Sequence, residues 1–288
     1  MSPLKRHSHY QDQKPTLYLI PTPIGNLDDM TYRAVKVLKD LDIIYAEDTR
    51  TSRKLLSHFD IKKPLDSYHD FNEESKLDQL IHQLDQGACI GLISDAGMPL
   101  ISDPGYHLVQ KAIEKDYHVV ALPGANAFLP ALTMSGLKTQ PFVFLGFLDA
   151  KKNKRLSMIE RVQYYPETLI FYESIHRIKQ TLKDLYQLLG NRSFVIAREI
   201  SKSYEEMIYG QLSEYNDLGD LKGELVLLVQ GYEDQPINQS LSIVDQVDFF
   251  IQQGMKKTEA MKKVSQMTKI PKNKIYQEYL QEKIKEES

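Results

Sequence analysis

The sequence predicts an α/β protein with two lobes and a small helical unit at its C-terminal end. Short apolar runs alternate with segments of helical apolar spacing over residues 16–136, which indicates a largely parallel sheet covered by helices. A second series of apolar runs with fewer helical segments occupies 141–232 and indicates a mixed lobe. Over 236–288 the spacing of the apolar residues is that of helices, without strand-like runs. Residues 1–15 are polar, and we expect them to form a loose leader.

Composition limits the possible function classes. The chain has 288 residues, of which 42% are hydrophobic and 26% charged, so it is ordinary globular material and long enough for two domains. Its formal net charge of −3 means that any nucleic-acid site must be a local basic patch. The single cysteine, Cys89, excludes disulfides within the chain and cysteine-based zinc sites, as in a reducing cytosol. Because no run of about 18 apolar residues occurs, we expect a cytoplasmic protein without a membrane span.

The first lobe opens with a strand at 16–20, a rigid loop at 21–27 and an amphipathic helix at 30–41. This loop lacks a GxGxxG pattern, so nothing supports a nicotinamide cofactor. A second strand at 42–46 ends in the polar stretch 47–54, EDTRTSRK. Such a cluster is either a helix cap followed by solvated arginines or part of a functional site.

The rest of the first lobe continues the alternation of strands and helices. The predicted elements are a helix at 72–84, a central strand at 88–93, a helix at 107–115, a strand at 117–122 and a loop of small residues at 123–129 that opens another helix.

The stretch 90–105 organises the lobe, because its apolar run ends in two Ser-Asp pairs, two glycines and two prolines. Proline lacks an N–H and glycine favours turns, so a long, stiff loop begins at the carboxyl end of this strand. Ligands bind at that end in open α/β sheets. Asp95 and Asp103 are the fixed negative charges of the loop, although a tight turn with local caps would use the same residue types.

The second lobe is predicted to contain strands at 142–147, 168–172, 193–197 and 224–230, separated from the first lobe by a linker-like segment at 136–141. Residues 151–155, KKNKR, form the densest basic spot of the chain, and such runs are usually solvated faces.

Three helices are predicted near the C-terminal end, at 243–251, 257–267 and 272–280. Nine lysines against seven acidic residues make this tail mildly basic, and its short connections are typical of a helix-turn-helix unit. A plain packing appendage is at least as consistent, because the tail has no arginine to bind phosphate with two hydrogen bonds.

Five ordered motifs together carry a family resemblance. They are LIPTPIGNL at 19–27, AEDTR at 46–50, SDAGMP with ISDPG at 94–105, LPGANA at 122–127 and YESIHR at 172–177. With them the chain resembles the ribosomal RNA small subunit methyltransferase I family of the tetrapyrrole methylase superfamily, from about Thr16 to Gly231. One departure is Ile175, which stands where the family usually has proline.

The resemblance implies a two-lobed, class III methyltransferase fold that binds S-adenosylmethionine in the cleft between its lobes. It also implies 2′-O-methylation of a cytidine in the decoding region of 16S rRNA, within the small ribosomal subunit, by a homodimer. The cofactor positions carried over are Pro23, Ser94, Asp95, Met98, Ile101, Ser102, Asn126, Ala127, Tyr172 and Glu173.

Methyl transfer from a sulfonium is an in-line displacement that depends mainly on positioning, so we expect no metal. A base or cation near the weakly acidic 2′-hydroxyl would help, and the candidates are Glu47, Asp48, Glu199 and Lys202. Each of them could instead pair with Arg50, Arg53 or Arg198. The substrate-binding candidates are Arg50, Arg53, His176, Arg177, Lys151, Lys152, Lys154 and Arg155.

Two other functions fit the same sequence. One is methylation of a small tetrapyrrole or a modified protein side chain by the same kind of lobe. The other is a non-catalytic role in RNA binding and ribosome assembly.

Overall fold

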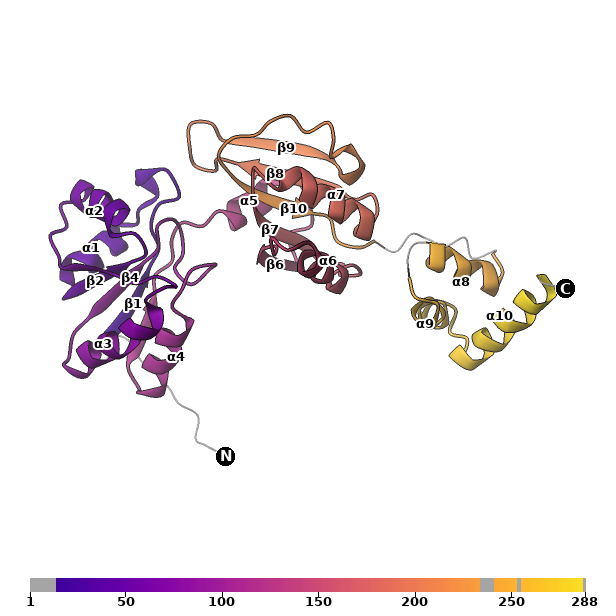
Figure 1. The fold of residues 1–288 in the computed structure, drawn as a ribbon, viewed down its shortest axis with the longest axis horizontal. Helices are drawn as coiled ribbons and strands as arrows, with labels where there is room; N and C mark the ends of the chain where they lie inside the picture. Colours follow the sequence, from indigo (N-terminus) through magenta and orange to yellow (C-terminus); the bar gives the residue numbers. More distant parts are fainter. Residues whose placement is uncertain (1–13, 234–240, 253–254, 287–288) are drawn as a thin grey trace.

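The computed structural model describes residues 14–233, 241–252 and 255–286, and these form two α/β lobes and a group of three helices (Figure 1). Most of the predicted leader therefore lies outside the described residues. The elements of the first part of the chain are β1 (Thr16–Ile20), α1 (Tyr32–Asp40), β2 (Ile43–Ala46), α2 (Thr49–His58), β3 (Leu65–Ser67), α3 (Glu73–Asp85), β4 (Ile90–Ile93), α4 (Tyr106–Glu114), β5 (His118–Ala121) and α5 (Phe128–Met134).

The first sheet is parallel throughout, in the order β3-β2-β4-β1-β5, which confirms the predicted parallel sheet with residues 90–93 at its centre. Helices α1 and α2 cover one face of this sheet, and α3 and α4 cover the other. The chain leaves β1 toward β2 and leaves β4 toward β5, in opposite directions. The carboxyl ends of β1 and β4 therefore mark the topological switch point, where open α/β sheets bind ligands.

The second sheet is mixed, in the order β6-β7-β10-β8-β9. The elements of this lobe are β6 (Phe142–Phe147), α6 (Lys152–Arg161), β7 (Thr168–Ser174), α7 (Ile178–Leu189), β8 (Ser193–Arg198), β9 (Glu206–Gln211) and β10 (Glu224–Val229). Strand β10 runs antiparallel to β7 and pairs Glu224 with Ser174. The start of β10 and the end of β7 consequently lie at the same edge of the sheet.

Helix α5 packs on the second sheet, although it directly follows the first in the chain. Alternate residues of β10 face opposite sides: Leu227 packs with α6 and α7, and Val226 packs with Leu132 of α5. The Phe128 ring of α5 also stacks on Phe144, with 4.7 Å between ring centroids. Both faces of the first sheet are already covered, so the apolar side of α5 is buried on the second one. The chain thus crosses between lobes before α5, whereas the sequence predicted the boundary at 136–141.

The three predicted C-terminal helices are present as α8 (Ile243–Gln252), α9 (Lys257–Thr268) and α10 (Lys272–Glu286), around a small core of their own. This group contacts the second lobe where Lys263 Nζ donates to Tyr232 Oη at 3.2 Å. No helix in the described ranges has the length and apolar character needed to cross a membrane.

Candidate active site

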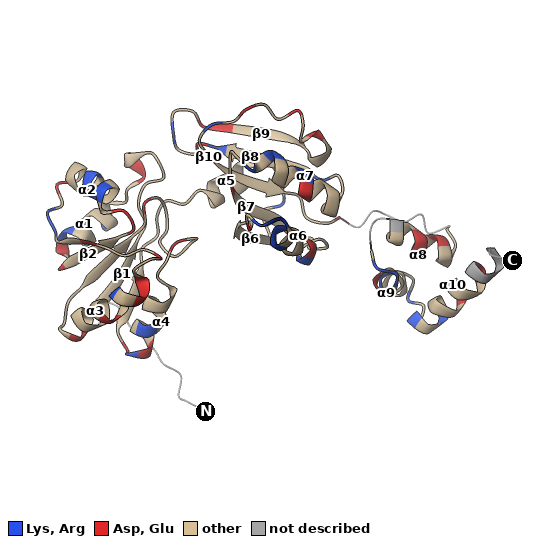
Figure 2. Cartoon of the chain, in the orientation of Figure 1, with Lys and Arg blue, Asp and Glu red and all other residues tan. Residues whose placement is uncertain are grey.

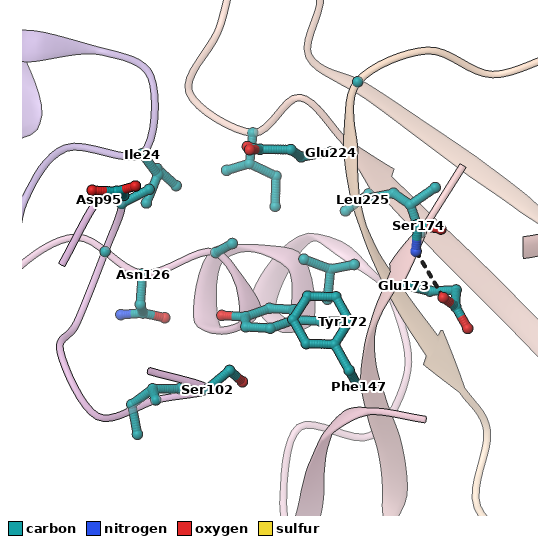
Figure 3. A pocket seen from close by; sticks show the side chains of 18 of the residues that line it. Ile24, Asp95, Ser102, Asn126, Phe147, Tyr172, Glu173, Ser174, Glu224 and Leu225 are labelled. Atoms are coloured by element: carbon teal, nitrogen blue, oxygen red, sulfur yellow. Dashed lines mark hydrogen bonds between the residues drawn. The ribbon is translucent and has the colours of Figure 1, made fainter. Parts of the chain in front are cut away.

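A cavity of about 550 Å³ lies between the two lobes, at the carboxyl ends of the first sheet's strands. Asp95 and Asn126 line it from loops of the first lobe, and Tyr172 and Glu224 line it from the second (Figure 3). Its volume is within the range of small-molecule and cofactor sites. The switch point predicted from the strand order is therefore an actual cavity in this structure.

The loops after β1 and β4 are tied together beside this cavity. Thr22 and Gly97 exchange two backbone hydrogen bonds, of 2.9 and 3.0 Å, and Gly97 has a φ of 84°, which glycine adopts readily. Ser94 is buried, and its hydroxyl donates to the Gly97 carbonyl at 2.9 Å. Of the predicted cofactor residues, Ser94 shapes this loop, and neither Ser94 nor Pro23 is among the residues that line the cavity.

The lobes also touch at the rim. Gly25 has a φ of 137°, and a Cβ there would lie 2.5 Å from the side chain of Lys202, so a larger residue would strain the backbone and displace that lysine. Nearby, the Ser201 hydroxyl of the second lobe hydrogen-bonds the Asp29 carboxylate of the first. These contacts fix the two sides of the cavity relative to each other.

Most of the predicted cofactor positions are brought together around the cavity. Those that line it are Asp95, Met98, Ile101, Ser102, Asn126, Ala127, Tyr172 and Glu173. Ser102 and the neighbouring Leu100 adopt left-handed φ angles of 75° and 69°, a strained conformation that is frequent at functional sites.

Glu173 differs from the prediction in the direction of its side chain, which points away from the cavity (Figure 3). Its buried carboxylate accepts from Thr181 Oγ1 at 2.6 Å and from the Ser174 N–H at 2.8 Å, and pairs with Arg177 Nη2 at 2.7 Å. These bonds anchor the end of β7 to α7. The carboxylate of Glu173 and the guanidinium of Arg177 are therefore paired with each other within the lobe. Glu173 still lines the cavity, and the roles of these two residues in cofactor and substrate binding stay predictions.

Asp103 is the carboxyl group with the most perturbed surroundings in the cavity. Burial first, then the charges of Glu47, Asp95 and Asp70, raise the pKa of Asp103 to about 7. Within the described part of the chain, no hydrogen bond or ion pair engages its side chain. Burial and the charge of Asp95 likewise raise the pKa of Glu47, although Glu47 does not line the cavity. The sequence marked Asp103 as a fixed charge without giving it a role, and its place in the second Ser-Asp pair was the available signal.

The other base candidates are engaged in ion pairs. Asp48 caps α2 by accepting from the Arg50 N–H at 2.8 Å, and hydrogen bonds from the Arg50 side chain and backbone lower the pKa of Asp48 to about 2. Glu199 accepts from the backbone of Glu224 and from Lys202 Nζ, both at 2.9 Å, and these bonds lower the pKa of Glu199. Lys202 Nζ also bonds Glu224, at 2.9 Å. The predicted ion-pair alternative thus holds for Asp48, which pairs with Arg50, whereas Glu199 and Lys202 pair with each other and not with the predicted arginines.

One of the four basic residues in the predicted patch at 151–155 is not at the surface. Arg155 is buried, because it lies on the same face of α6 as Ile159, and its Nε pairs with Asp184 Oδ2 at 2.8 Å. Its Nη1 donates to the carbonyls of Asp149 and Ala150. The expectation that Arg155 binds substrate is therefore wrong. The remaining members of the patch, Lys151, Lys152 and Lys154, are exposed.

His176, by contrast, lines the cavity, whereas Arg50 and Arg53 lie exposed on α2 outside it. Residues that the sequence did not assign include Phe147, Glu224 and Leu225. Only the pairing of β10 with β7 brings the latter two to this edge.

Comparisons with known proteins agree with this architecture. The family of Tetrapyrrole (Corrin/Porphyrin) Methylases matches residues 16–216. Among solved structures, a diphthine synthase aligns with a TM-score of 0.61 and 13% identity, over 75% of this chain and 90% of that one. A uroporphyrin-III-C-methyltransferase from Thermus thermophilus aligns with a TM-score of 0.55 and 16% identity, over 75% and 94%. These similarities establish the fold alone.

More similar relatives are found among curated sequences. A ribosomal RNA small subunit methyltransferase I of Halalkalibacterium halodurans is 47% identical, over 97% of this chain and the whole of its own length. Its namesake from Bacillus subtilis is 42% identical, over 91% of this chain and 93% of its own. The chain therefore belongs to the ribosomal RNA small subunit methyltransferase I family, within the tetrapyrrole methylases.

Proposed function

We propose that this chain transfers a methyl group from S-adenosylmethionine to the 2′-hydroxyl of a cytidine in the decoding region of 16S rRNA. The observation that carries the proposal is its alignment with relatives named ribosomal RNA small subunit methyltransferase I over both lobes and the C-terminal helices. The ribose, the cytidine and the decoding region follow from the resemblance of the five sequence motifs to that family. The cavity between the lobes supplies a site in which such a transfer can take place.

The chemistry of the cavity suits S-adenosylmethionine. This molecule carries a sulfonium, an ammonium and a carboxylate group together with a flat aromatic base. The carboxylate of Asp95 offers the complementary negative charge, and Ile101, Phe147 and Tyr172 offer apolar surface. When bound, the cofactor supplies an electrophilic methyl group. Asp95 and Asn126 would hold its polar groups, and the three apolar side chains would exclude water from the base.

The acceptor hydroxyl must lose its proton as the new O–C bond forms. Asp103 is suited to take it, because its carboxyl lines the cavity and is not engaged by other described side chains. With a pKa of about 7, a substantial fraction of Asp103 is ionised at neutral pH. The ionised carboxylate is also a stronger base than an ordinary aspartate. Most of the rate enhancement would still come from holding donor and acceptor in line.

The proposal includes a cytoplasmic homodimer whose partner is the small ribosomal subunit. The single cysteine fits a reducing compartment, and the dimer is implied by the family resemblance. Light scattering of the purified chain tests the dimer directly.

The decisive experiment is radiolabel transfer from S-adenosylmethionine to isolated small subunits that lack the modification. A 2′-O-methyl group blocks alkaline cleavage of the adjacent phosphodiester, so the label should appear in an alkali-stable dinucleotide from the decoding region of 16S rRNA. Label in a fully hydrolysed nucleotide would place the methyl group on a base. Transfer only to a tetrapyrrole or a protein side chain, or no transfer at all, would favour the two other functions considered above.

A further inference from the structure

The basic residues of the first lobe are concentrated on one segment. Residues 16–136 contain eleven Lys and Arg and seventeen Asp and Glu, so the lobe as a whole is acidic. Five of the eleven basic residues fall within 49–63, together with a single acidic one, Asp60. The five are Arg50, Arg53, Lys54, Lys62 and Lys63, and we call them the α2 basic strip.

The strip has an exposed face of its own. Arg50, Arg53 and Lys54 are three and four positions apart and therefore share one side of α2, whereas Ser52 and Leu56 on the other side are buried. Figure 2 marks Lys and Arg positions in blue on the ribbon of α2 in the first lobe. The side chain of Arg50 is 89% exposed and, among the residues that the structure describes, forms an ion pair with Asp48 alone. Such exposed pairs are weak, so a phosphate can replace the carboxylate.

A shallow groove of about 240 Å³ lies at the C-terminal end of α2. Its lining carries three positive charges, from Arg53, Lys62 and Lys63, and one negative charge, from Asp60. The side chain of Lys62 is 88% exposed and its pair with Asp60, at 3.1 Å, is also solvent-facing. Cations that converge on a concave surface favour phosphate, and the arginine fork can bind two phosphate oxygens.

Helix α2 links this groove to the cavity. Its N-terminal cap, Asp48, is hydrogen-bonded through its backbone N–H to Asp95, which lines the cavity. The helix has ten residues, which at 1.5 Å per residue corresponds to about 15 Å. Positive charge therefore extends from Arg50, in the first turn of α2, down the flank of the lobe.

From this arrangement we propose that the α2 basic strip binds the phosphodiester backbone that flanks the target nucleotide in the RNA substrate. The identity of that RNA rests on the proposed function. An extended polyanion fits the strip because its charges are spread over a length that several consecutive phosphates can follow, while the surrounding lobe is acidic.

The test measures the salt dependence of binding to isolated small subunits. Two double variants, Arg53→Gln with Lys54→Gln and Lys62→Gln with Lys63→Gln, each remove two charges. A matched control, Lys111→Gln with Lys115→Gln, removes two charges from α4 and its C-cap, on the opposite face of the same sheet. On single-stranded nucleic acid, each phosphate contact contributes about −0.7 to the slope of log K against log salt. Each strip variant should therefore reduce the magnitude of this slope by about 1.4, and the control should leave it unchanged.

The inference is wrong if both strip variants keep the slope of the unsubstituted chain, or if the α4 control lowers it equally. Methyl transfer to the same subunits by the unsubstituted chain tests the proposed function separately. If that transfer is absent, the same variants are measured on polyuridylate. A reduced slope there supports the strip as an RNA surface although the proposed function has failed, and an unchanged slope overturns the strip as well.

Discussion

The backbone N–H of Asp48 donates a 3.1 Å hydrogen bond to Oδ1 of Asp95. This bond joins the cap of α2, within the motif at 47–50, to the loop that follows β4. Asp95 thus acts both as a charge at the cavity and as an acceptor that positions a neighbouring loop. Substitutions that keep one of these properties and remove the other can separate them.

We expect Asp95→Asn to weaken S-adenosylmethionine binding about tenfold, the scale of one charged hydrogen bond, while the melting temperature stays unchanged. The amide oxygen can still accept from the Asp48 N–H, so the loop contact is retained. Asp95→Ala should lose affinity by at least as much, because it removes the acceptor too. Titration calorimetry measures both, and an Asn variant that binds as tightly as the unsubstituted chain would contradict the assignment.

Arg155→Ala should destabilise the second lobe by about 3–5 kcal/mol, because it leaves the buried Asp184 carboxylate without its cationic partner. The matched control is Lys154→Ala, one residue earlier on the exposed side of α6, where we expect a change within about 0.5 kcal/mol. Urea unfolding compares the two variants. Equal stability would mean that the buried pair contributes nothing to the fold.

Arg155 also illustrates what the sequence could and could not predict. Charge density picked out 151–155 correctly as basic, but which of its side chains faces solvent depends on the phase of α6, and no helix was predicted there. The strands with continuous apolar runs, such as β4 and β7, were predicted within two residues of their observed ends. The three-residue edge strand β3 is only half-buried and too short to show an alternating pattern.

The site was predictable where it follows strand ends within one lobe. The loop after β4 and the pair Asn126 and Ala127 come directly from motifs that begin at such ends. Glu224 could not be predicted, because its place opposite Ser174 depends on the strand order of the second sheet. Glu173 was placed at the cavity correctly, but the rotation of its carboxylate toward Thr181 is set by tertiary packing.

Asp103 should make stability depend on pH in a specific direction. Its folded-state pKa of about 7 lies above the ordinary value of 3.8, so between these values the folded state binds more protons than the unfolded state. The free energy of unfolding should therefore fall as pH rises from about 4 to 7, relative to an Asp103→Asn variant that lacks this titration. Melting curves over that range test the sign. If the unsubstituted chain instead became more stable relative to the Asp103→Asn variant as the pH rises, the prediction would be contradicted.

The same group should govern activity in the opposite sense. As the base of the proposed reaction, Asp103 must be ionised, so kcat/KM should increase through an apparent pKa near 7. The charges that raise the pKa of Asp103 are those of Glu47, Asp95 and Asp70, so the apparent value belongs to the coupled set. Asp103→Asn should lower kcat by about 100-fold or more, within the usual range for a general base, and abolish this rise. If the Asp103→Asn variant kept both its kcat and the rise of kcat/KM with pH, another group would be the proton acceptor.

The motif at 47–50 provides the last prediction, that it acts on the acceptor rather than on the cofactor. Glu47 and Arg50 lie beside the cavity loop through Asp48, yet neither side chain lines the cavity. Arg50 is exposed and its pair with Asp48 is solvent-facing, so Glu47→Gln and Arg50→Gln should preserve the melting temperature and the affinity for S-adenosylmethionine.

Both variants should nevertheless lower methyl transfer to small subunits by at least about tenfold, the scale of one lost transition-state contact. Arg50 can bind a phosphate with two hydrogen bonds, and Glu47 can accept from a ribose hydroxyl. Asp48→Ala is the structural comparison, because removing the cap of α2 should lower the melting temperature. Early melting of the Glu47 or Arg50 variant would show that the motif is a structural ion-pair cluster, and normal methyl transfer would show that the acceptor is bound elsewhere.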